Sequence, residues 1–224
     1  MVDEGQDFEQ DWFELLTLFL RADADILWLE DRDQNLQGKP PVQIDHFVGY
    51  RCPVNYRSPE SIARFIRNRL PFAFEPGNDL PGLGVGVQAY DDPASQPKIV
   101  ARILQDLIRR GFSHDDIVLL TCRGFGGSVF SEIESVGGVR LRRFLGEYDA
   151  AGNPVLTEGR LTFDSVWRFK GQEAHAVILV DVDPSPERAL QSDRLLYCGM
   201  TRATVRLDLV VRADNPENRR FLEP

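Results

Sequence analysis

The sequence predicts an α/β protein built on a mostly parallel β-sheet that helices cover on both faces. Two observations support this prediction. Segments with helical spacing of apolar residues alternate with short strand-like segments along most of the chain. Several of the strand-like segments, such as DIVLLTC and AVILVDV, are continuous apolar runs, which is typical of strands buried on both faces.

The first part of the chain predicts a helix, a strand and a second helix, over residues 8–22, 24–31 and 58–70. Asp7 would cap the first helix, and Ser58 would cap the second, with Pro59 at its first helical position. Residues 71–97 are rich in proline and glycine and predict a loop with one short strand near VGVQAY.

The rest of the chain predicts a regular alternation of elements. Helices are expected over residues 98–111, 128–135 and 187–204, and strands over 116–122, 139–145, 160–166, 176–182 and 205–211. Residues 147–159 predict a turn-rich connection. Because ligands of such sheets bind beyond the carboxyl ends of the strands, functional residues are expected in loops that follow strands.

Composition limits the classes of protein to consider. The 224 residues are enough for one large domain, or for one domain and part of another. No apolar run approaches the roughly 20 residues that span a membrane, and three scattered cysteines fit a reducing cytoplasm better than a disulfide framework. With a net charge of -9, a nucleic-acid binder would need a local basic surface.

Five stretches combine charge, glycine and special spacing: VDEGQD (2–7), WLEDRDQNLQ (28–37), NYRSPESI (55–62), SVWRFKGQEAHAVILV (165–180) and LLYCGMTRATVRLDLVV (195–211). Taken alone, the first stretch is better explained as an acidic terminus that caps a helix. The second can be a polar turn, and the third a capped helix with a surface arginine. Their chemistry therefore has to be judged together.

The charged residues of these stretches suit phosphate chemistry. Asp3 at a strand end can hold Mg²⁺, and Glu4 beside it can orient an attacking water. Gln34 follows a second strand and can sense a phosphate. Arg57 precedes a helix start, where anions bind. Arg202 lies on a largely apolar helix, where an arginine needs a partner such as a transferring phosphoryl group.

Other residues of these stretches suit nucleotide or nucleic-acid contacts. Gly171 lets the backbone approach a ligand, and Glu173 is available to a sugar hydroxyl. Tyr56 can stack on a base. A nucleic-acid strand can bind near the start of the fourth stretch, where stacking and charge are available from Trp167, Arg168 and Lys170.

In their order along the chain, VDEGQD, EDRDQ, NYRS, FKGQE and YCGMTRA resemble motifs II to VI of superfamily 1 helicases of the UvrD/Rep type. Five matches in the family's order, covering nearly the whole chain, make the resemblance specific. YCGMTRA is the closest, because the family pattern is roughly Leu-Tyr-Val-Ala-Leu-Thr-Arg-Ala. Trp167 and Gln172 depart from the family, which often has a histidine and an aliphatic residue at these places.

The resemblance implies two RecA-like domains that bind ATP and Mg²⁺ between them, with a single nucleic-acid strand, DNA rather than RNA, crossing their top. Residues 1–48 would be the end of the first domain, with motifs II and III, and residues 49–224 the second, with motifs IV to VI. Larger relatives insert an accessory domain ahead of motif V, and here only a turn at 146–159 occupies that place.

The resemblance also implies a role for each candidate residue. Asp3 would bind Mg²⁺, Glu4 would orient water, Gln34 would couple the γ-phosphate to the nucleic-acid site, and Arg57 and Arg202 would reach the γ-phosphate. Tyr56 would lie near the adenine and Gly171 and Glu173 near the ribose, while Trp167, Arg168 and Lys170 would lie near the nucleic acid.

One part of the family pattern is missing from the sequence. No Gly-x-x-x-x-Gly-Lys-Ser/Thr occurs, and the nearest glycine cluster, RGFGGS (123–128), has no lysine. A P-loop backbone and its lysine are the main holders of the β- and γ-phosphates. The chain is therefore interpreted as the C-terminal part of an ATP-dependent helicase or translocase that has no ATPase activity alone, with Met1 an internal methionine of a longer protein.

Two alternatives stay open at this point. The chain can be a stand-alone degenerate module that binds nucleic acid or protein, or one half of a split ATPase whose partner chain supplies the P-loop. If residues 1–37 are cut from a larger sheet, the apolar side chains within residues 8–30 lose their partners. Self-association, packing on the second domain or partial disorder is then expected for this stretch.

Overall fold

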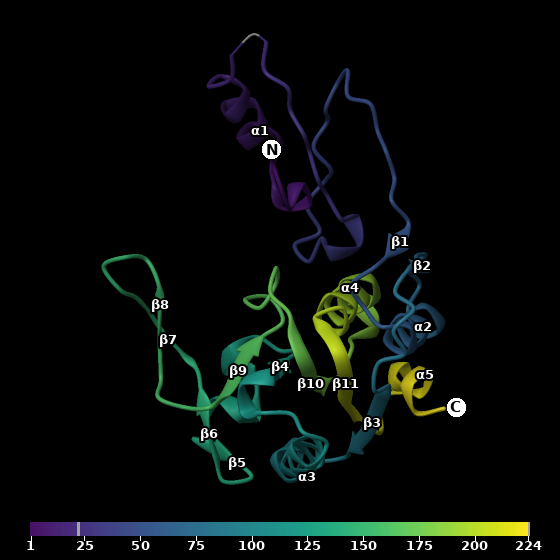
Figure 1. Cartoon of the computed structure of the whole chain (residues 1–224), viewed down its shortest axis with the longest axis vertical. Helices are drawn as coiled ribbons and strands as arrows, with labels where there is room; N and C mark the ends of the chain where they lie inside the picture. The colour runs from purple at the N-terminus through teal and green to yellow at the C-terminus, as the bar shows by residue number, and fades with distance from the viewer. Residues whose placement is uncertain (22, 224) are drawn as a thin grey trace. The chain divides into compact units, whose positions relative to one another are not determined.

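The computed structural model describes residues 1–21 and 23–223. The chain forms two compact units, Met1–Pro53 and Val54–Pro224 (Figure 1). Among the described residues, no helix is both long enough and apolar enough to cross a membrane.

In the first unit, the start of the chain pairs in parallel with the backbone around Trp28. Val2 forms an isolated parallel bridge with Trp28: its N–H donates to the carbonyl of Leu27 at 2.8 Å, and its carbonyl accepts from the N–H of Leu29 at 2.9 Å. The Trp28 ring packs edge-on against Phe8 and Phe13, with ring centroids 5.4 and 5.3 Å apart. The unit also contains helix α1 (Gln10–Thr17) and 3-10 turns at Gly5–Asp7 and Arg32–Gln34.

Both elements predicted for this unit are shorter than expected. Of the helix expected over 8–22, residue 22 lies outside the described residues; among the others the helix spans Gln10–Thr17, and none of its residues is buried. Short helices depend on apolar packing, so a helix without buried residues gains little from further turns. The strand expected over 24–31 is reduced to the bridge at Trp28, since one short segment pairs with it.

The second unit is built on a seven-stranded sheet with the order β3-β11-β10-β4-β9-β6-β5. All neighbouring strands are parallel except β5 and β6, which confirms the expected mostly parallel sheet. The strands are β3 (Val85–Tyr90), β4 (Ile117–Thr121), β5 (Ser135–Val136), β6 (Val139–Arg142), β9 (Leu161–Ser165), β10 (Ala174–Val182) and β11 (Ala203–Arg212).

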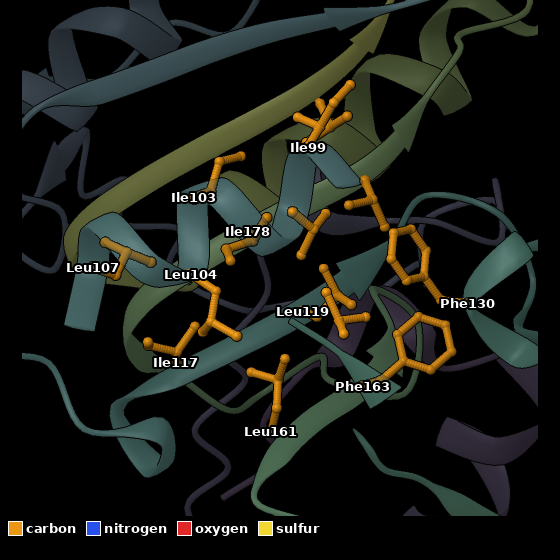
Figure 2. Close-up of a cluster of buried hydrophobic side chains, with 14 of the residues drawn as sticks. Ile99, Ile103, Leu104, Leu107, Ile117, Leu119, Phe130, Leu161, Phe163 and Ile178 are labelled. Carbon is orange, nitrogen blue, oxygen red and sulfur yellow. The ribbon is translucent and has the colours of Figure 1, made fainter. Parts of the chain in front are cut away.

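Helix α3 (Gln96–Arg109) covers one face of this sheet. Figure 2 shows Ile99, Ile103, Leu104 and Leu107 of the helix over strand residues that include Leu119 and Ile178. These side chains are nearly fully buried. Each large aliphatic side chain buried in this way stabilises the fold by about 1.5–3 kcal/mol.

Helices α2 (Glu60–Arg69), α4 (Ala189–Met200) and α5 (Arg219–Leu222) lie on the opposite face. Gly199 shows how closely α4 approaches β10, because a Cβ atom there would lie 2.9 Å from Leu179 Cδ1. Leu179 points to α4 while its neighbours Ile178 and Val180 face α3. This alternation explains why β10 is apolar throughout, as expected for a strand covered on both faces.

Two connecting segments differ from the prediction. The helix expected over 128–135 is replaced by a 3-10 turn at Val129–Ser131 followed by β5, because residues 135–136 pair with β6 across a glycine turn. The segment 146–159 is more than a turn: β7 (Phe144–Tyr148) and β8 (Pro154–Leu156) form a separate antiparallel hairpin. A second small sheet pairs β1 (Val54–Asn55) with β2 (Glu75–Pro76).

Gly159 is required where the chain enters β9. A Cβ atom at this position would lie 2.4 Å from the carbonyl carbon of Leu141 and 2.5 Å from the nitrogen of Arg142, and backbone atoms cannot move aside alone. We expect Gly159→Ala to lower the free energy of unfolding by about 1–3 kcal/mol, measured by urea denaturation. Gly126→Ala is the matched control, because nothing lies within 4 Å of its Cβ position. Equal midpoints for the two variants would contradict the steric argument.

Candidate functional site

Three of the sequence motifs meet in the second unit. The Arg57 guanidinium forms an ion pair with the Glu173 carboxylate, with Nε and Oε2 3.5 Å apart. Arg202 donates from Nη1 to the backbone carbonyl of Gln172 at 3.3 Å. The stretches NYRS, FKGQE and YCGMTRA, far apart in sequence, are therefore joined around residues 172–173.

This meeting point lies at the amino ends of two central strands. Glu173 directly precedes β10, and Arg202 directly precedes β11. A cleft of about 480 Å³ opens at the same edge, and Gln172, Glu173 and Thr204 contribute to its lining. Both residues therefore lie at the opposite edge from the carboxyl ends of the strands, although Glu173 ends the loop that follows β9.

Arg202 is held by the end of its own helix. The residue is 1% exposed, and its Nε donates to the carbonyl of Cys198 at 3.0 Å while its Nη2 donates to Thr201 Oγ1 at 3.3 Å. Its own carbonyl accepts a hydrogen bond from the N–H of Ala174 at 3.0 Å. The last carbonyls of a helix lack partners within the helix, and the guanidinium supplies one of those partners here.

Arg57 and Tyr56 lie on a turn that leads into α2. The Asn55 side-chain oxygen accepts hydrogen bonds from the N–H groups of Arg57 and Ser58, at 3.0 and 2.9 Å. The expected cap is therefore wrong, since Pro59 takes the cap position and Ser58 is buried beside Asn55. Both Tyr56 and Arg57 are exposed, so their side chains are accessible to a ligand.

The stretch from Val166 to Glu173 runs from one edge of the sheet to the other. Ser165 is level with Val180, because both pair with Thr121 of β4. Ala174 begins β10 six residues before Val180, which corresponds to about 20 Å along the strand. The chain turns at Gly171, which has a φ of +84°, a conformation that glycine adopts without strain.

Trp167 and Arg168 occupy different environments within this stretch. Trp167 is 45% exposed at the carboxyl edge of the sheet, as a contact residue would be. Arg168 is committed to neighbouring side chains: its Nε donates to Asp164 Oδ1 at 3.1 Å, and its guanidinium carbon lies 3.6 Å from the centre of the Phe144 ring. Burial raises the pKa of Asp164, and the hydrogen bond from the N–H of Ser165 and the charge of Arg168 oppose that rise. Lys170 is half-buried.

In the first unit, hydrogen bonds connect the two acidic stretches. Gln6 donates from Nε2 to Glu4 Oε2 at 2.5 Å, and its Oε1 accepts from the N–H of Asp31 at 2.9 Å. Asp31 Oδ2 in turn accepts from Gln34 Nε2 at 2.7 Å. Gln6 and Asp31, which sequence reasoning missed, therefore link Glu4 to Gln34, and Gln6 is buried in the structure.

Asp3 and Glu4 have the chemistry of a Mg²⁺ site but little prearranged geometry. Asp3 is exposed, its Oδ1 accepts from the N–H of Glu4 at 2.9 Å, and Glu4 has a left-handed φ of 55°. Within the described ranges, no group of three or more His, Cys, Asp or Glu side chains could hold a metal ion. Mg²⁺ in nucleotide sites typically uses one or two carboxylates together with substrate phosphates. Asp3 and Glu4 therefore fit the one or two carboxylates of such a site, with the other ligands supplied by the substrate phosphates.

A second cluster, at the carboxyl edge of the sheet, was not predicted. Asp181 is 2% exposed and has a left-handed φ of 55° within an irregularity of β10. Its carboxylate accepts hydrogen bonds from Gln96 Nε2 at 2.8 Å, Thr121 Oγ1 at 2.7 Å and Ser128 Oγ at 2.6 Å. The buried carboxylate ties the start of α3 to both ends of the glycine-rich loop after β4. The acid inside the apolar run AVILVDV was the only signal in the sequence.

Comparison with known proteins shows which of them share part of this sequence or its fold. Residues 161–210, which include Trp167, Glu173 and Arg202, match the model of the UvrD-like helicase C-terminal domain. The C-terminal domain of a possible DNA helicase from Lactobacillus plantarum WCFS1 has a similar structure, with a TM-score of 0.50 and 19% identity over 74% of this chain and 92% of that chain. At that identity the likeness shows the fold alone. No curated protein matches the chain. Residues 161–210 are therefore similar to the C-terminal domain of UvrD-like helicases, and the chain shares the fold of a helicase C-terminal domain.

Proposed function

We propose that the chain is the C-terminal part of an ATP-dependent superfamily 1 helicase or translocase that acts on single-stranded DNA. Residues 49–224 would be its second RecA-like domain, and residues 1–48 the end of the first. The observation that supports this best is the convergence of Arg57, Glu173 and Arg202 on one edge of the sheet, because these residue types suit a nucleotide.

The nucleotide-facing roles follow from charge and exposure. Arg57 is an exposed cation that pairs with the exposed carboxylate of Glu173. Exposed ion pairs contribute at most about 1 kcal/mol. Arg57 can therefore exchange Glu173 for a γ-phosphate. Glu173 would then be released to a ribose hydroxyl, and Tyr56 would stack on the adenine. Arg202 would act from the end of α4, where it also holds Gln172.

The other groups of the proposed ATP site would come from the first unit and from a P-loop, which the sequence does not contain. Asp3 would hold Mg²⁺, Glu4 would orient the attacking water, and Gln34 would couple the γ-phosphate to the nucleic-acid site. When bound, ATP with Mg²⁺ would supply the phosphoryl group whose transfer drives movement. The sequence contains no P-loop motif, so we expect no appreciable ATP turnover by this chain alone. Robust Mg²⁺-dependent turnover by the purified chain, in a coupled assay, would contradict this part of the proposal.

Trp167 gives a direct test of the nucleic-acid part. Stacking of a base on an aromatic side chain contributes about 1–3 kcal/mol, so we expect Trp167→Ala to weaken binding of a labelled oligothymidylate about tenfold. Fluorescence anisotropy measures this, and affinity should fall as salt rises, since phosphate contacts release counterions. Tyr50→Ala is the control, an exposed aromatic residue of the first unit outside residues 8–30. Absence of binding at 50 mM salt (about a 14 Å screening length), or equal loss in both variants, would contradict the proposal.

Residues 8–30 give a test of self-association. Trp12, Leu15, Phe19 and Leu27 are all more than half exposed, which is unusual for large apolar side chains gathered in one short stretch. We expect the sedimentation coefficient of the chain to rise with concentration, and Phe19→Ser to reduce that rise. Leu190→Ser, which changes an exposed leucine in the second unit, is the control. A concentration-independent coefficient would contradict self-association.

A further inference from the structure

The β7–β8 hairpin, residues 144–156, projects from the main sheet as an arm (Figure 1). Phe144 pairs with Leu156 and Tyr148 with Pro154 in an antiparallel ladder. The root of the arm continues this pairing, because the N–H of Thr157 donates to the Arg143 carbonyl at 2.7 Å and the N–H of Arg160 to the Arg140 carbonyl at 3.0 Å. The arm is therefore firmly connected to the edge of the sheet.

One face of the arm carries aromatic side chains. The rings of Phe144 and Tyr148 lie 5.2 Å apart, so they share a face. Phe144 is half-buried, whereas Tyr148 is 62% exposed. An exposed ring that rests on a fixed neighbour is a suitable platform for a flat ligand.

Arg168 connects this face to the stretch that carries Trp167. Its guanidinium stacks on the Phe144 ring with 3.6 Å between the guanidinium carbon and the ring centre. Its Nε donates to Asp164 Oδ1, and the same oxygen accepts from the N–H of Ser165 at 2.8 Å. The guanidinium is thus fixed between the arm on one side and the carboxyl end of β9 on the other.

We propose that the arm binds single-stranded nucleic acid by stacking a base on Tyr148, and that Arg168 positions the arm instead of contacting a phosphate. This inference rests on the proposed function, because Arg168, the chain neighbour of the exposed Trp167, stacks on Phe144, and Phe144 in turn contacts Tyr148. Glu147 and Asp149 flank Tyr148, and these acids disfavour a phosphate contact at the arm. Arg140 and Arg160 are exposed and lie side by side at the root of the arm, where their backbones are hydrogen-bonded. They supply local positive charge for the phosphates of the nucleic-acid backbone.

Tyr148 variants test the stacking contact. We expect Tyr148→Ala to weaken oligothymidylate binding about fivefold to tenfold in the anisotropy assay, and Tyr148→Phe to bind as the unchanged chain does, because the ring is kept. Tyr50→Ala, an exposed tyrosine in the first unit, is the matched control and should bind normally. Each variant is first checked for an unchanged urea midpoint.

Arg168 variants test the positioning role through salt dependence. A side chain that contacts a phosphate contributes about 0.7 to the slope of log K against log salt for a single strand. We expect Arg168→Gln to weaken binding with an unchanged slope, and Lys170→Gln to reduce the slope. The Tyr148→Ala/Arg168→Gln double variant should bind oligothymidylate only slightly more weakly than the single variant with the lower affinity, because both residues act through the arm.

The outcomes separate this inference from the proposed function. If Trp167→Ala weakens binding and Tyr148→Ala does not, the arm is not a nucleic-acid contact and the proposed function stands. If Arg168→Gln lowers the slope by about 0.7, Arg168 contacts a phosphate and its positioning role is overturned. If the unchanged chain binds no oligothymidylate, both proposals fail.

Discussion

Replacement of Asp181 by alanine is expected to lower the free energy of unfolding by roughly 3–5 kcal/mol. The carboxylate accepts hydrogen bonds from Gln96, Thr121 and Ser128, all of which are buried. Each buried donor left without an acceptor costs about 1–3 kcal/mol. Alanine would also have to adopt the left-handed φ of 55°, which costs about 1–2 kcal/mol.

Asp181→Asn separates the charge of this residue from its shape. The amide oxygen still accepts one hydrogen bond, the Thr121 and Ser128 hydroxyls can rotate to accept from the amide, and asparagine tolerates left-handed backbone. We expect it to recover more than half of the loss. Asp214→Ala is the control, an exposed aspartate paired with Arg212, and should cost less than about 1 kcal/mol. Urea denaturation followed by circular dichroism measures all three. A cost of Asp181→Ala equal to that of Asp214→Ala would show that the network does not stabilise the fold.

The sheet could be predicted because its signal is local and strong. Strands such as β4 and β10 are continuous apolar runs, and alternate side chains of β10 contact α3 and α4. The short α1 and the bridge at Trp28 could not be predicted in length, because element length depends on packing partners that lie elsewhere in the chain. Ser128 shows the same limit: its side chain bonds to Asp181, 53 residues away, and the residues after it form a 3-10 turn and β5 in place of the expected helix.

The site could be predicted in membership but not in geometry. The order of the motifs grouped Arg57, Glu173 and Arg202, and contacts through residues 172–173 join all three. Periodicity could not show that Glu173 and Arg202 lie at the amino edge, because residues 166–173 cross the sheet without forming a strand or helix of their own. The roles of Arg168 and Asp181 depend on partners in other elements, Phe144 and Gln96, which no local pattern identifies.

Arg202 was predicted as a phosphate ligand, and its surroundings predict a second, structural effect. We expect Arg202→Ala to lower the free energy of unfolding by roughly 2–4 kcal/mol, because the carbonyls of Cys198 and Gln172 lose a charged donor inside the protein. Arg202→Lys should recover little of this loss, since one ammonium group cannot reproduce the planar fork that reaches Cys198, Gln172 and Thr201.

Two arginine controls decide whether the Arg202 loss reflects its buried bonds. Arg64→Ala removes an exposed arginine that pairs with Glu60, and Arg57→Ala removes the exposed partner of Glu173. Each should change the free energy of unfolding, measured by urea denaturation, by less than about 1 kcal/mol. A large loss for Arg202→Ala and Arg202→Lys alone would mean that the guanidinium fixes residues 172–173. A nucleotide that draws Arg202 toward its phosphate would then also have to move Glu173 and the start of β10. Equal midpoints for Arg202→Ala and Arg64→Ala would mean that the guanidinium is not needed to hold this edge.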